Sequence, residues 1–277
     1  MSELLFQAIV LGVVQGLSEF LPISSSGHLV LVPWLLGWDA NGLTSSLTFD
    51  LGLHLGTSAA LLAYFWRDWV SLVQAVIRGL TDAKARASHE WKLAWLIVLG
   101  CLPAGIVGVL FEDKIEANVR QPALIAALLI VFGFVLLAAD RIGKRSRGLA
   151  QVTLTDSIVI GVAQILALAP GVSRSGITMT AGLFQGLDRP AAARFSFLLS
   201  APITIAAALY KLRVLVKQPP TAPETVAFVI GAAVAAIVGA LAIGFLLRYL
   251  QRQPVDVFTW YRLAAGVFVI ALVLLGH

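Results

Sequence analysis

The chain has 277 residues, of which 59% are hydrophobic and 13% are charged, and its formal net charge is +5. Soluble domains usually carry about 25% charged and about 45–50% apolar residues, so this composition excludes an ordinary soluble domain and indicates a membrane protein. A single cysteine, Cys101, excludes internal disulfides and a cysteine-rich metal site. Basic residues do not gather in a patch with interleaved aromatic residues, so the sequence predicts no nucleic-acid partner.

The first predicted element is an interrupted apolar segment over residues 3–36, which Pro22 divides near its middle. Proline removes a helical hydrogen-bond donor and clashes with the preceding turn, so it ends or kinks a helix. Each half is predicted to be too short to cross a bilayer core of roughly 30 Å. We therefore expect a re-entrant helix hairpin, with its irregular tip facing protein or a wet cavity.

Beyond this hairpin, apolar runs alternate with short polar connections. A transmembrane helix needs about 17–25 predominantly apolar residues. A second interrupted segment, 153–187, is broken by Pro170 and Gly171 and predicts a second re-entrant hairpin. The uninterrupted runs of spanning length are 47–66, 93–111, 122–139, 226–247 and 258–276.

The two interrupted segments match each other at a constant offset of 149, with GVVQGLSEFLPISSSGH (12–28) over GVAQILALAPGVSRSGI (161–177). Identical pairs include Gln15 with Gln164, Ser24 with Ser173, Ser26 with Ser175 and Gly27 with Gly176. Three spans per repeat is an odd number, so the second repeat must be inverted, as in folds that bind ligands near the bilayer midplane. The sequence therefore predicts one all-α polytopic membrane domain, 1–277. It comprises two inverted-topology repeats, 1–148 and 149–277, each a re-entrant hairpin plus three transmembrane helices.

Lysine and arginine residues are distributed unequally between the two predicted sides of the membrane. Fourteen lie in the connections 67–92, 141–152, 188–194 and 248–262, and five lie on the opposite side. The positive-inside rule assigns the richer side to the cytoplasm. The first hairpin is therefore predicted to open outward and the second inward, with both tips meeting inside the membrane.

Polar residues gather at the tip of the first hairpin. Gln15 and Glu19 are four residues apart and therefore share one face of a helix. A carboxylate near a helix C-terminus at membrane depth needs a cation, a metal ion or a proton. Three serines (24–26), Gly27 and His28 begin the next half-helix, whose free N–H groups form an anion site. His28 can exchange a proton near neutral pH.

The second tip has the same pattern, but Arg174 takes the place that Ser25 has in the first. An arginine inside a membrane indicates function, and its planar guanidinium suits phosphate oxygens. The serines 173 and 175 and Gly176 complete this second anion site. If the two tips meet, they form one cavity suited to a phosphoester or a pyrophosphate.

Simpler interpretations of the same residues stay open. Serines in membrane helices often bond only their own backbone or a neighbouring helix. A lone histidine inside a membrane is commonly structural, and Glu19 and Arg174 could serve only to neutralise each other. Asp50 and His54 are interpreted as cavity-rim or helix-start residues.

The segments QGLSEFLPISSSGH (15–28) and PGVSRSG (170–176) resemble the two signature motifs of the undecaprenyl-pyrophosphate phosphatase family, also called bacitracin-resistance proteins. The resemblance covers essentially the whole chain. It implies a bacterial inner-membrane enzyme that hydrolyses undecaprenyl pyrophosphate to the monophosphate and inorganic phosphate, which recycles the lipid carrier for cell-wall synthesis and confers bacitracin resistance. It also implies a site open to the periplasm, a homodimer, and a divalent cation, Mg²⁺ or Ca²⁺.

The positions of these motifs predict the roles of individual residues. Arg174 and the helix N-termini hold the pyrophosphate, Ser25 attacks the terminal phosphorus, and Glu19 or His28 moves its proton. Attack by His28 and attack by water stay open as alternatives. A metal ion is expected on Glu19 and substrate oxygens, because Gln15 leaves only one carboxylate in the first motif. The residues predicted to bind substrate are Gln15, Ser24, Ser26, Gly27, Ser173, Ser175 and Gly176.

Two other functions are compatible with parts of the pattern. Inverted repeats with broken helices are a transporter design, so the chain could move a polyprenyl phosphate across the membrane, with or without hydrolysis. The unrelated type-2 lipid phosphatases share partly similar SGH and SR motifs. They need a second histidine shortly after the SR, and residues 175–190 contain none, so we set this class aside.

Overall fold

The computed structural model describes residues 2–38, 42, 47–217 and 221–276, and these form an all-helical protein. Within these ranges the only β pairing is an isolated bridge between Arg147 and Leu187. Six helices are long and apolar enough to cross a membrane. The predicted class, an all-α polytopic membrane protein, is confirmed.

In chain order the helices are α1 (Ser2–Phe20), α2 (Ser25–Leu35), α3 (Leu47–Tyr64), α4 (Trp66–Thr81), α5 (His89–Val119), α6 (Pro122–Ile142), α7 (Leu154–Ala163), α8 (Arg174–Phe184), α9 (Arg189–Lys217), α10 (Ala222–Tyr249) and α11 (Asp256–Leu274). Short 3₁₀ turns are η2 (Ala85–Ala87), η3 (Leu149–Gln151) and η4 (Gln164–Leu168). The five uninterrupted apolar runs coincide with the helices α3, α5, α6, α10 and α11. Four of these, α5, α6, α10 and α11, are among the six candidate spans, and α1 and α9 are the other two.

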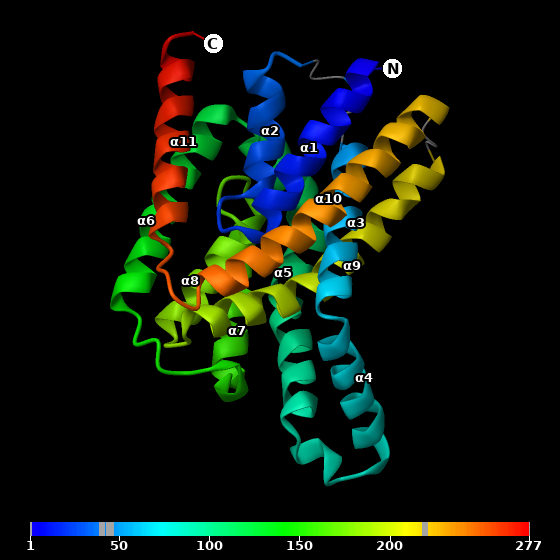
Figure 1. Ribbon diagram of the computed structural model, residues 1–277, viewed down its shortest axis with the longest axis vertical. Coiled ribbons are helices and arrows are strands. Elements are labelled where there is room, and N and C mark those ends of the chain that lie inside the picture. The colour runs from blue at the N-terminus through cyan, green and yellow to red at the C-terminus, as the bar shows by residue number, and fades with distance from the viewer. Residues whose placement is uncertain (1, 39–41, 43–46, 218–220, 277) are drawn as a thin grey trace.

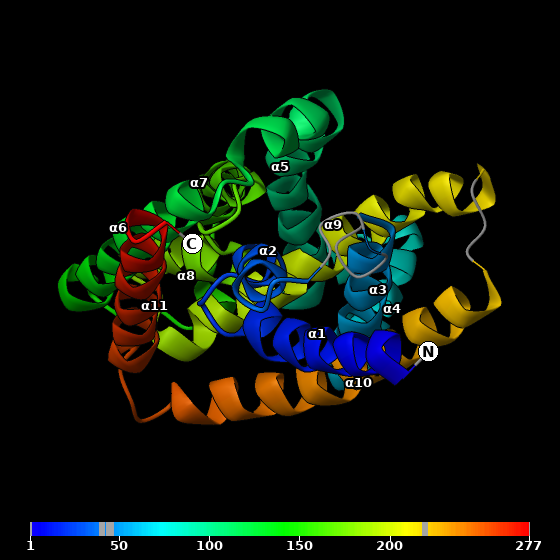
Figure 2. The same ribbon diagram turned by 90° about the horizontal axis from the view of Figure 1, so that it is seen from above.

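The two interrupted segments form helix–break–helix hairpins. Figure 1 shows α1 beginning and α2 ending at the upper end of the molecule, whereas α7 begins and α8 ends toward the lower end. Seen from above, α2 lies near the middle, with α5, α6, α11 and α10 around it (Figure 2). The tips of the two hairpins therefore approach from opposite directions. The division into two repeats at 148 and 149 stays a prediction.

Three details of the predicted topology are wrong. Helix α1 has 19 residues, so it is long enough to span a bilayer rather than too short. Most of the predicted connection 67–92 is helical, because α4 continues beyond α3 after a break at Phe65. Helix α11 begins at Asp256, so Arg262 lies inside this helix with 0% exposure and not in a connection.

Each hairpin turns at a serine with an unusual backbone conformation. Ser24 has φ 78° and Ser173 has φ 77°, in the left-handed region that non-glycine residues rarely adopt. Each caps the helix that follows: Ser24 Oγ accepts from Gly27 N at 3.4 Å, and Ser173 Oγ accepts from Gly176 N at 3.1 Å. The same cap therefore starts α2 and α8.

Helix α10 crosses α1 and α3 and holds the first hairpin in place. The approach is close because small residues line the contact: a Cβ added at Gly12 would lie 2.7 Å from the carbonyl oxygen of Gly231. Helix α11 packs against α6 on the other side of the hairpins. The two hairpins are thus enclosed by spanning helices.

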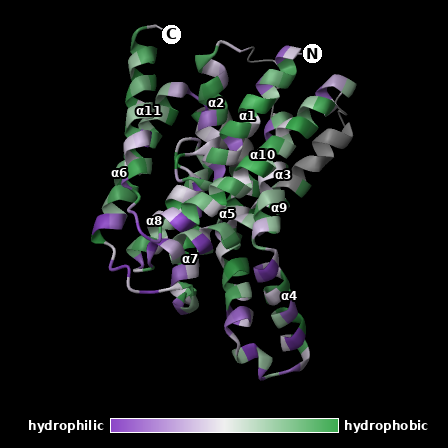
Figure 3. Ribbon diagram, viewed as in Figure 1, coloured by the Kyte–Doolittle hydropathy of each residue, from purple (hydrophilic) through white to green (hydrophobic). Residues whose placement is uncertain are grey.

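Charged residues concentrate at one end of the molecule. Figure 3 shows hydrophilic residues at the lower ends of α4 and α5 and in the connection from α6 to α7, below a largely hydrophobic body. Without the buried Arg262, thirteen lysines and arginines remain in the four predicted connections against five on the other side. The charge bias therefore persists after the correction.

Candidate active site

A cavity of about 250 Å³ lies where the two hairpin tips face helices α3, α5 and α9. Its wall combines polar groups with apolar ones, as ligand sites usually do. Its polar lining residues are Glu19, Ser25, Ser26, Asp50, His54, Arg120, Gln164, Arg174 and Thr204. Of the residues predicted to form the site, the cavity is thus lined by Glu19, Ser25, Ser26 and Arg174.

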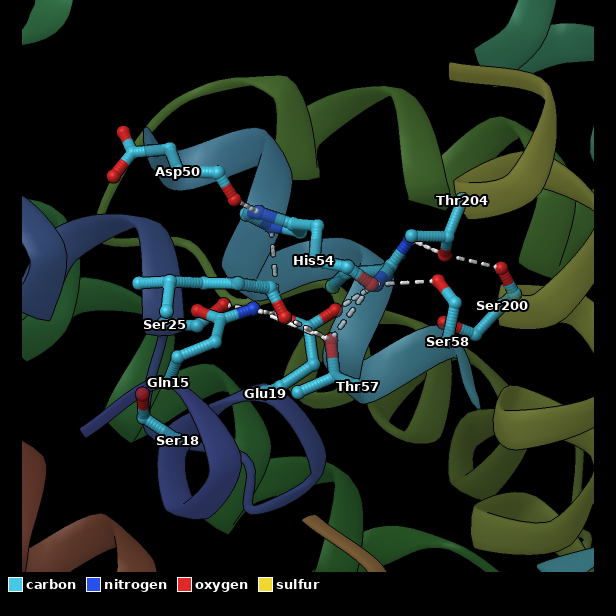
Figure 4. Close-up of polar contacts among 12 residues, drawn as sticks. Gln15, Ser18, Glu19, Ser25, Asp50, His54, Thr57, Ser58, Ser200 and Thr204 are labelled. Carbon is cyan, nitrogen blue, oxygen red and sulfur yellow. Dashed lines mark hydrogen bonds and ion pairs between the residues drawn. The ribbon is translucent and has the colours of Figure 1, made fainter. Parts of the chain in front are cut away.

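Glu19, at the end of α1, is the centre of the polar contacts (Figure 4). Its Oε2 accepts from Ser25 Oγ at 2.5 Å and from Gln15 Nε2 at 3.1 Å. Its Oε1 is ion-paired with Arg174 Nη2. The side chain of Glu19 is only 4% exposed, so the arginine supplies the cation that a buried carboxylate requires.

Arg174, the first residue of α8, reaches across to the first hairpin. Besides Glu19 it contacts Thr204 of α9, to which Nη1 donates at 2.7 Å. A guanidinium has five N–H donors, and these two contacts are its only hydrogen bonds to described residues. The remaining N–H groups are available to an anion in the cavity.

The first turns of α2 and α8 supply further donors. The N–H groups of Ser25 and Ser26 have no acceptor among the described residues, nor have those of Arg174 and Ser175. Unpaired N–H groups of this kind, with the helix dipole, form a general anion-binding feature. Ser25, Ser26 and Arg174 also line the cavity, so both helix starts are adjacent to it.

The other predicted site residues do not line the cavity; they join or support the two tips. Ser24 Oγ accepts from Gly171 N at 3.0 Å, and Ser175 Oγ donates to Leu21 O at 3.1 Å. Gly27 is needed for tight packing, because an added Cβ would lie 3.1 Å from Ile125 Cγ2. The predicted residues placed outside the cavity lining are Gln15, Ser24, Gly27, His28, Ser173, Ser175 and Gly176.

His28 has partners on both ring nitrogens. Nδ1 lies 2.7 Å from Ser24 O, and Nε2 lies 2.7 Å from the hydroxyl of Tyr261 in α11. A carbonyl oxygen only accepts, so Nδ1 carries the proton, and the neutral ring accepts from Tyr261 through Nε2. The nitrogen lone pair that a nucleophile would use is therefore occupied.

Sequence reasoning assigned Asp50 and His54 only to the cavity rim or the helix start, but both line the cavity. His54 Nε2 lies 3.8 Å from Glu19 Oε2, and Nδ1 lies 2.7 Å from Asp50 O. Asp50 also meets Arg120, with 3.4 Å between Oδ2 and Nη2. The spacing of four between Asp50 and His54, which matches that of Gln15 and Glu19, was the available signal.

Arg262 of α11 fastens the two tips together. It donates to Pro22 O of the first tip and to Val172 O of the second, each at 3.1 Å, and to Gly171 O at 2.9 Å. Nε also donates to Leu129 O of α6 at 3.0 Å. Backbone carbonyls at helix breaks lack helical donors, and inside a membrane each unpaired group is costly. One arginine therefore satisfies both breaks.

Replacing Arg262 with methionine is expected to destabilise the protein by several kcal/mol, because each buried carbonyl left without a donor costs roughly 1–3 kcal/mol. The carbonyls of Pro22 and Gly171 would lose their donor in an apolar setting. Thermal unfolding in detergent would measure this change. The matched control is Arg252→Met, which alters an exposed arginine and should leave the melting temperature unchanged. Equal melting temperatures for the two variants would contradict the role of Arg262.

The protein's own oxygen atoms could coordinate a divalent cation here only together with oxygen atoms of a bound substrate. Among the described residues, no three or more His, Cys, Asp or Glu side chains are arranged so that they could hold a metal ion together. Gln15 Oε1, however, is buried without a hydrogen-bond partner, beside Glu19. Amide and carboxylate oxygens suit Mg²⁺ and Ca²⁺, and Mg²⁺ often binds one or two carboxylates plus phosphate. The donors fit an ion shared with a phosphorylated substrate, and they do not form a closed metal cage.

The fold and the site define a class: polytopic helical membrane proteins in which two hairpin tips enclose a glutamate, a serine hydroxyl and an arginine. Residues 8–268 match the family model described as bacitracin resistance protein BacA, and the chain belongs to this family.

Curated relatives cover nearly the whole chain. A protein of Pelotomaculum thermopropionicum is 47% identical over 267 residues, 96% of each chain. Proteins of Moorella thermoacetica and Geobacter metallireducens are 49% and 48% identical, each over 96% of this chain and 97% of the relative. All three carry the name undecaprenyl-diphosphatase.

Proposed function

We propose that the protein is an undecaprenyl-diphosphatase, which hydrolyses undecaprenyl pyrophosphate to undecaprenyl phosphate and inorganic phosphate. Family membership and the names of the relatives support this activity. The structural observation that supports it best is the contact of Ser25 Oγ with Glu19 Oε2 at 2.5 Å, beside Arg174. The serine hydroxyl can act as nucleophile, the glutamate as base, and the guanidinium can bind phosphate; a phosphate transfer needs these three groups.

The biological role follows from this reaction. The product is the lipid carrier for cell-wall synthesis, so the enzyme recycles that carrier, and removal of the pyrophosphate form confers resistance to bacitracin. The cavity is lined by Asp50, near the start of α3, and by Arg120, at the end of α5. Both lie at the end with fewer lysines and arginines, which supports a site open to the outer face of the bacterial inner membrane. A homodimer is part of the same proposal, on family grounds.

In the proposed mechanism, the terminal phosphate binds against Arg174 and the free N–H groups that start α2 and α8. These donors are fixed by the fold before substrate arrives, so they need little reorganisation as charge develops. Gln15 and Arg174 each hold one oxygen of Glu19 and keep its Oε2 directed at Ser25. Positioning and electrostatics supply most of the catalysis in phosphate transfer.

Ser25 Oγ attacks the terminal phosphorus while its proton passes to Glu19, and the bond to the bridging oxygen breaks. The proton then goes to the leaving polyprenyl monophosphate. In the second step, water attacks the phosphoserine, Glu19 takes a proton from that water, and Ser25 Oγ regains a proton as inorganic phosphate leaves. His54, 3.8 Å from Glu19, is placed to take up protons from it.

A divalent cation completes the proposal. Glu19, with the carbonyl oxygen of Gln15 beside it, would hold it together with substrate phosphate oxygens. The ion would offset the negative charge of the pyrophosphate.

The test is phosphate release from a polyprenyl diphosphate by the purified protein in detergent. We expect steady turnover that EDTA lowers at least about tenfold and that added Mg²⁺ or Ca²⁺ restores, since a bound ion typically contributes several kcal/mol to such reactions. The same lipid carrying only one phosphate is the control and should release none. A folded protein that binds the diphosphate and releases no phosphate would contradict the enzyme proposal. The inverted hairpins would then be interpreted as the gate of a polyprenyl-phosphate transporter.

A further inference from the structure

Gln164 is a buried cavity residue that the mechanism above does not use. It is the first residue of η4, directly after α7, and it lines the same cavity as Glu19 and Arg174. Its side chain is almost completely enclosed, with only 2% exposure of the residue. Neither its Nε2 nor its Oε1 has a hydrogen-bond partner within the described ranges.

An unpaired buried amide of this kind is uncommon. More than about nine in ten buried polar groups in folded proteins have a partner, so each exception indicates a ligand, a catalytic role or an absent water. Gln15 occupies the matching position of the first hairpin, and its Nε2 donates to Glu19 at 3.1 Å. The second hairpin has no carboxylate at the matching place, because residue 168 is a leucine. The amide of Gln164 therefore has its donor available.

The surroundings of Gln164 indicate which part of a substrate lies beside it. Ser25, Glu19 and His54 form the polar wall of the cavity, from α1, α2 and α3. The wall contributed by α5, η4 and α9, together with Pro170, is largely apolar. It comprises Ala104, Ala167, Leu168, Pro170, Ile203 and Ala207, with Thr204 as a polar residue of α9. Gln164 is a polar group within that apolar wall. A substrate with a charged head and a hydrocarbon chain would place its terminal phosphate at the polar wall and its chain along the apolar one.

We propose that Gln164 binds the phosphate that carries the prenyl chain, which is the leaving group of the reaction, by donating from Nε2 to one of its oxygens. This proposal rests on the proposed phosphatase activity and adds a second phosphate subsite to it. The donor would stabilise charge that develops on the leaving phosphate. It would also favour substrates with two consecutive phosphates, because a diphosphate alone reaches both Arg174 and Gln164.

The test is direct binding in detergent, which needs no turnover. Gln164→Leu keeps the volume and removes the donor. We expect it to weaken binding of a polyprenyl monophosphate about tenfold to a hundredfold, the range for one hydrogen bond to a charged group. Binding of inorganic phosphate, which occupies the subsite at Arg174, should change by less than about twofold. The kcat/KM for the diphosphate should fall by a factor similar to that for the monophosphate.

Stability separates a binding role from a structural one. Because the amide is unpaired, Gln164→Leu should melt at the same temperature as the wild type or higher. Gln253→Leu, in an exposed connection, is the matched control and should change no binding constant. Equal weakening of both ligands, weakening of neither, or a lowered melting temperature with unchanged affinities would overturn the proposal. A wild type that binds both ligands as expected and shows no turnover would contradict only the proposed activity.

Discussion

Replacement of Ser25 by alanine is expected to lower the rate of phosphate release by at least about a thousandfold, because it removes the attacking oxygen. The hydroxyl donates to Glu19 Oε2 at 2.5 Å, and the residue lines the cavity, so it meets both a base and a bound phosphate. Initial rates with a polyprenyl diphosphate at saturating concentration would measure the change. Ser26→Ala is the matched control, since Ser26 lines the same cavity without a contact to Glu19, and we expect a loss of about tenfold or less.

The same experiment ranks the alternative nucleophiles. His28→Ala should reduce the rate much less than Ser25→Ala, because Ser24 O and Tyr261 already engage both ring nitrogens and hold the ring outside the cavity lining. A substrate labelled on its terminal phosphate should leave label on the wild-type protein after rapid quenching, and none on Ser25→Ala. Full activity of Ser25→Ala, with activity lost in His28→Ala, would assign the attack to the histidine. Loss in neither variant would favour attack by water.

The arrangement of the fold was largely predictable because membrane helices are set by local composition. Runs of about 20 apolar residues can satisfy their backbone only as helices, so four of the candidate spans, α5, α6, α10 and α11, were located from the sequence as uninterrupted runs. Pro22 and Pro170 interrupt two further runs, and the matching polar residues around them predicted that both tips would be alike. Ser24 and Ser173, with nearly equal positive φ angles, have the same cap geometry.

The division of roles within the tips could not be predicted from the sequence. Serines and glycines at a helix break suit an anion site, but they equally suit the contact of two breaks with each other. The order of residues does not say which side of the tip faces the cavity. Ser25 and Ser26 lie on that side, whereas Ser24 and Ser175 point to the opposite hairpin.

Hydrogen-bond partners that are distant in the sequence, such as those of Arg262, could not be predicted either. Arg262 was counted in the charged connection 248–262, although the predicted apolar run 258–276 also includes it. The signals of a helix start, Pro254 followed by Asp256, place the boundary earlier and would have put the arginine inside the membrane. Even so, its partners Pro22 and Val172 are 240 and 90 residues away in sequence. No local pattern connects them.

In this site, the residues that hold the two hairpin tips together differ from the residues that are proposed to react. Arg262, Ser24 and Ser175 hold the two backbone breaks together on the side away from the cavity. Glu19 and Arg174 are thereby brought into contact across the two hairpins, 155 residues apart in sequence. An ion pair of this kind is compatible with catalysis only if a phosphate can also bind the arginine. The N–H groups of Arg174 that are not bonded to Glu19 or Thr204 make such binding possible.

Arg174→Ala is expected to lower phosphate release about a thousandfold or more, within the range measured when an arginine that stabilises phosphate transfer is removed. Arg174→Lys keeps the positive charge but loses the planar fork that contacts Glu19 and Thr204 together, so we expect partial activity, roughly a hundredfold below wild type. Steady-state rates in detergent would measure both changes. Arg194→Ala is the matched control: it removes an arginine whose ion-pair partner is Asp68, away from the cavity lining, and should leave the rate within about twofold.

A double substitution distinguishes catalysis from simple charge neutralisation. If Arg174 served only to neutralise Glu19, the harm in Arg174→Ala would come from a carboxylate left buried without its cation, at a cost of about 3–5 kcal/mol. Adding Glu19→Gln would remove that charge and restore both the melting temperature and the activity. If both residues act in the reaction, the double variant regains its melting temperature and stays inactive, because the phosphate has lost its arginine and Ser25 has lost its base. Recovered activity in the double variant would contradict the proposed mechanism; recovered stability alone is the result that we expect.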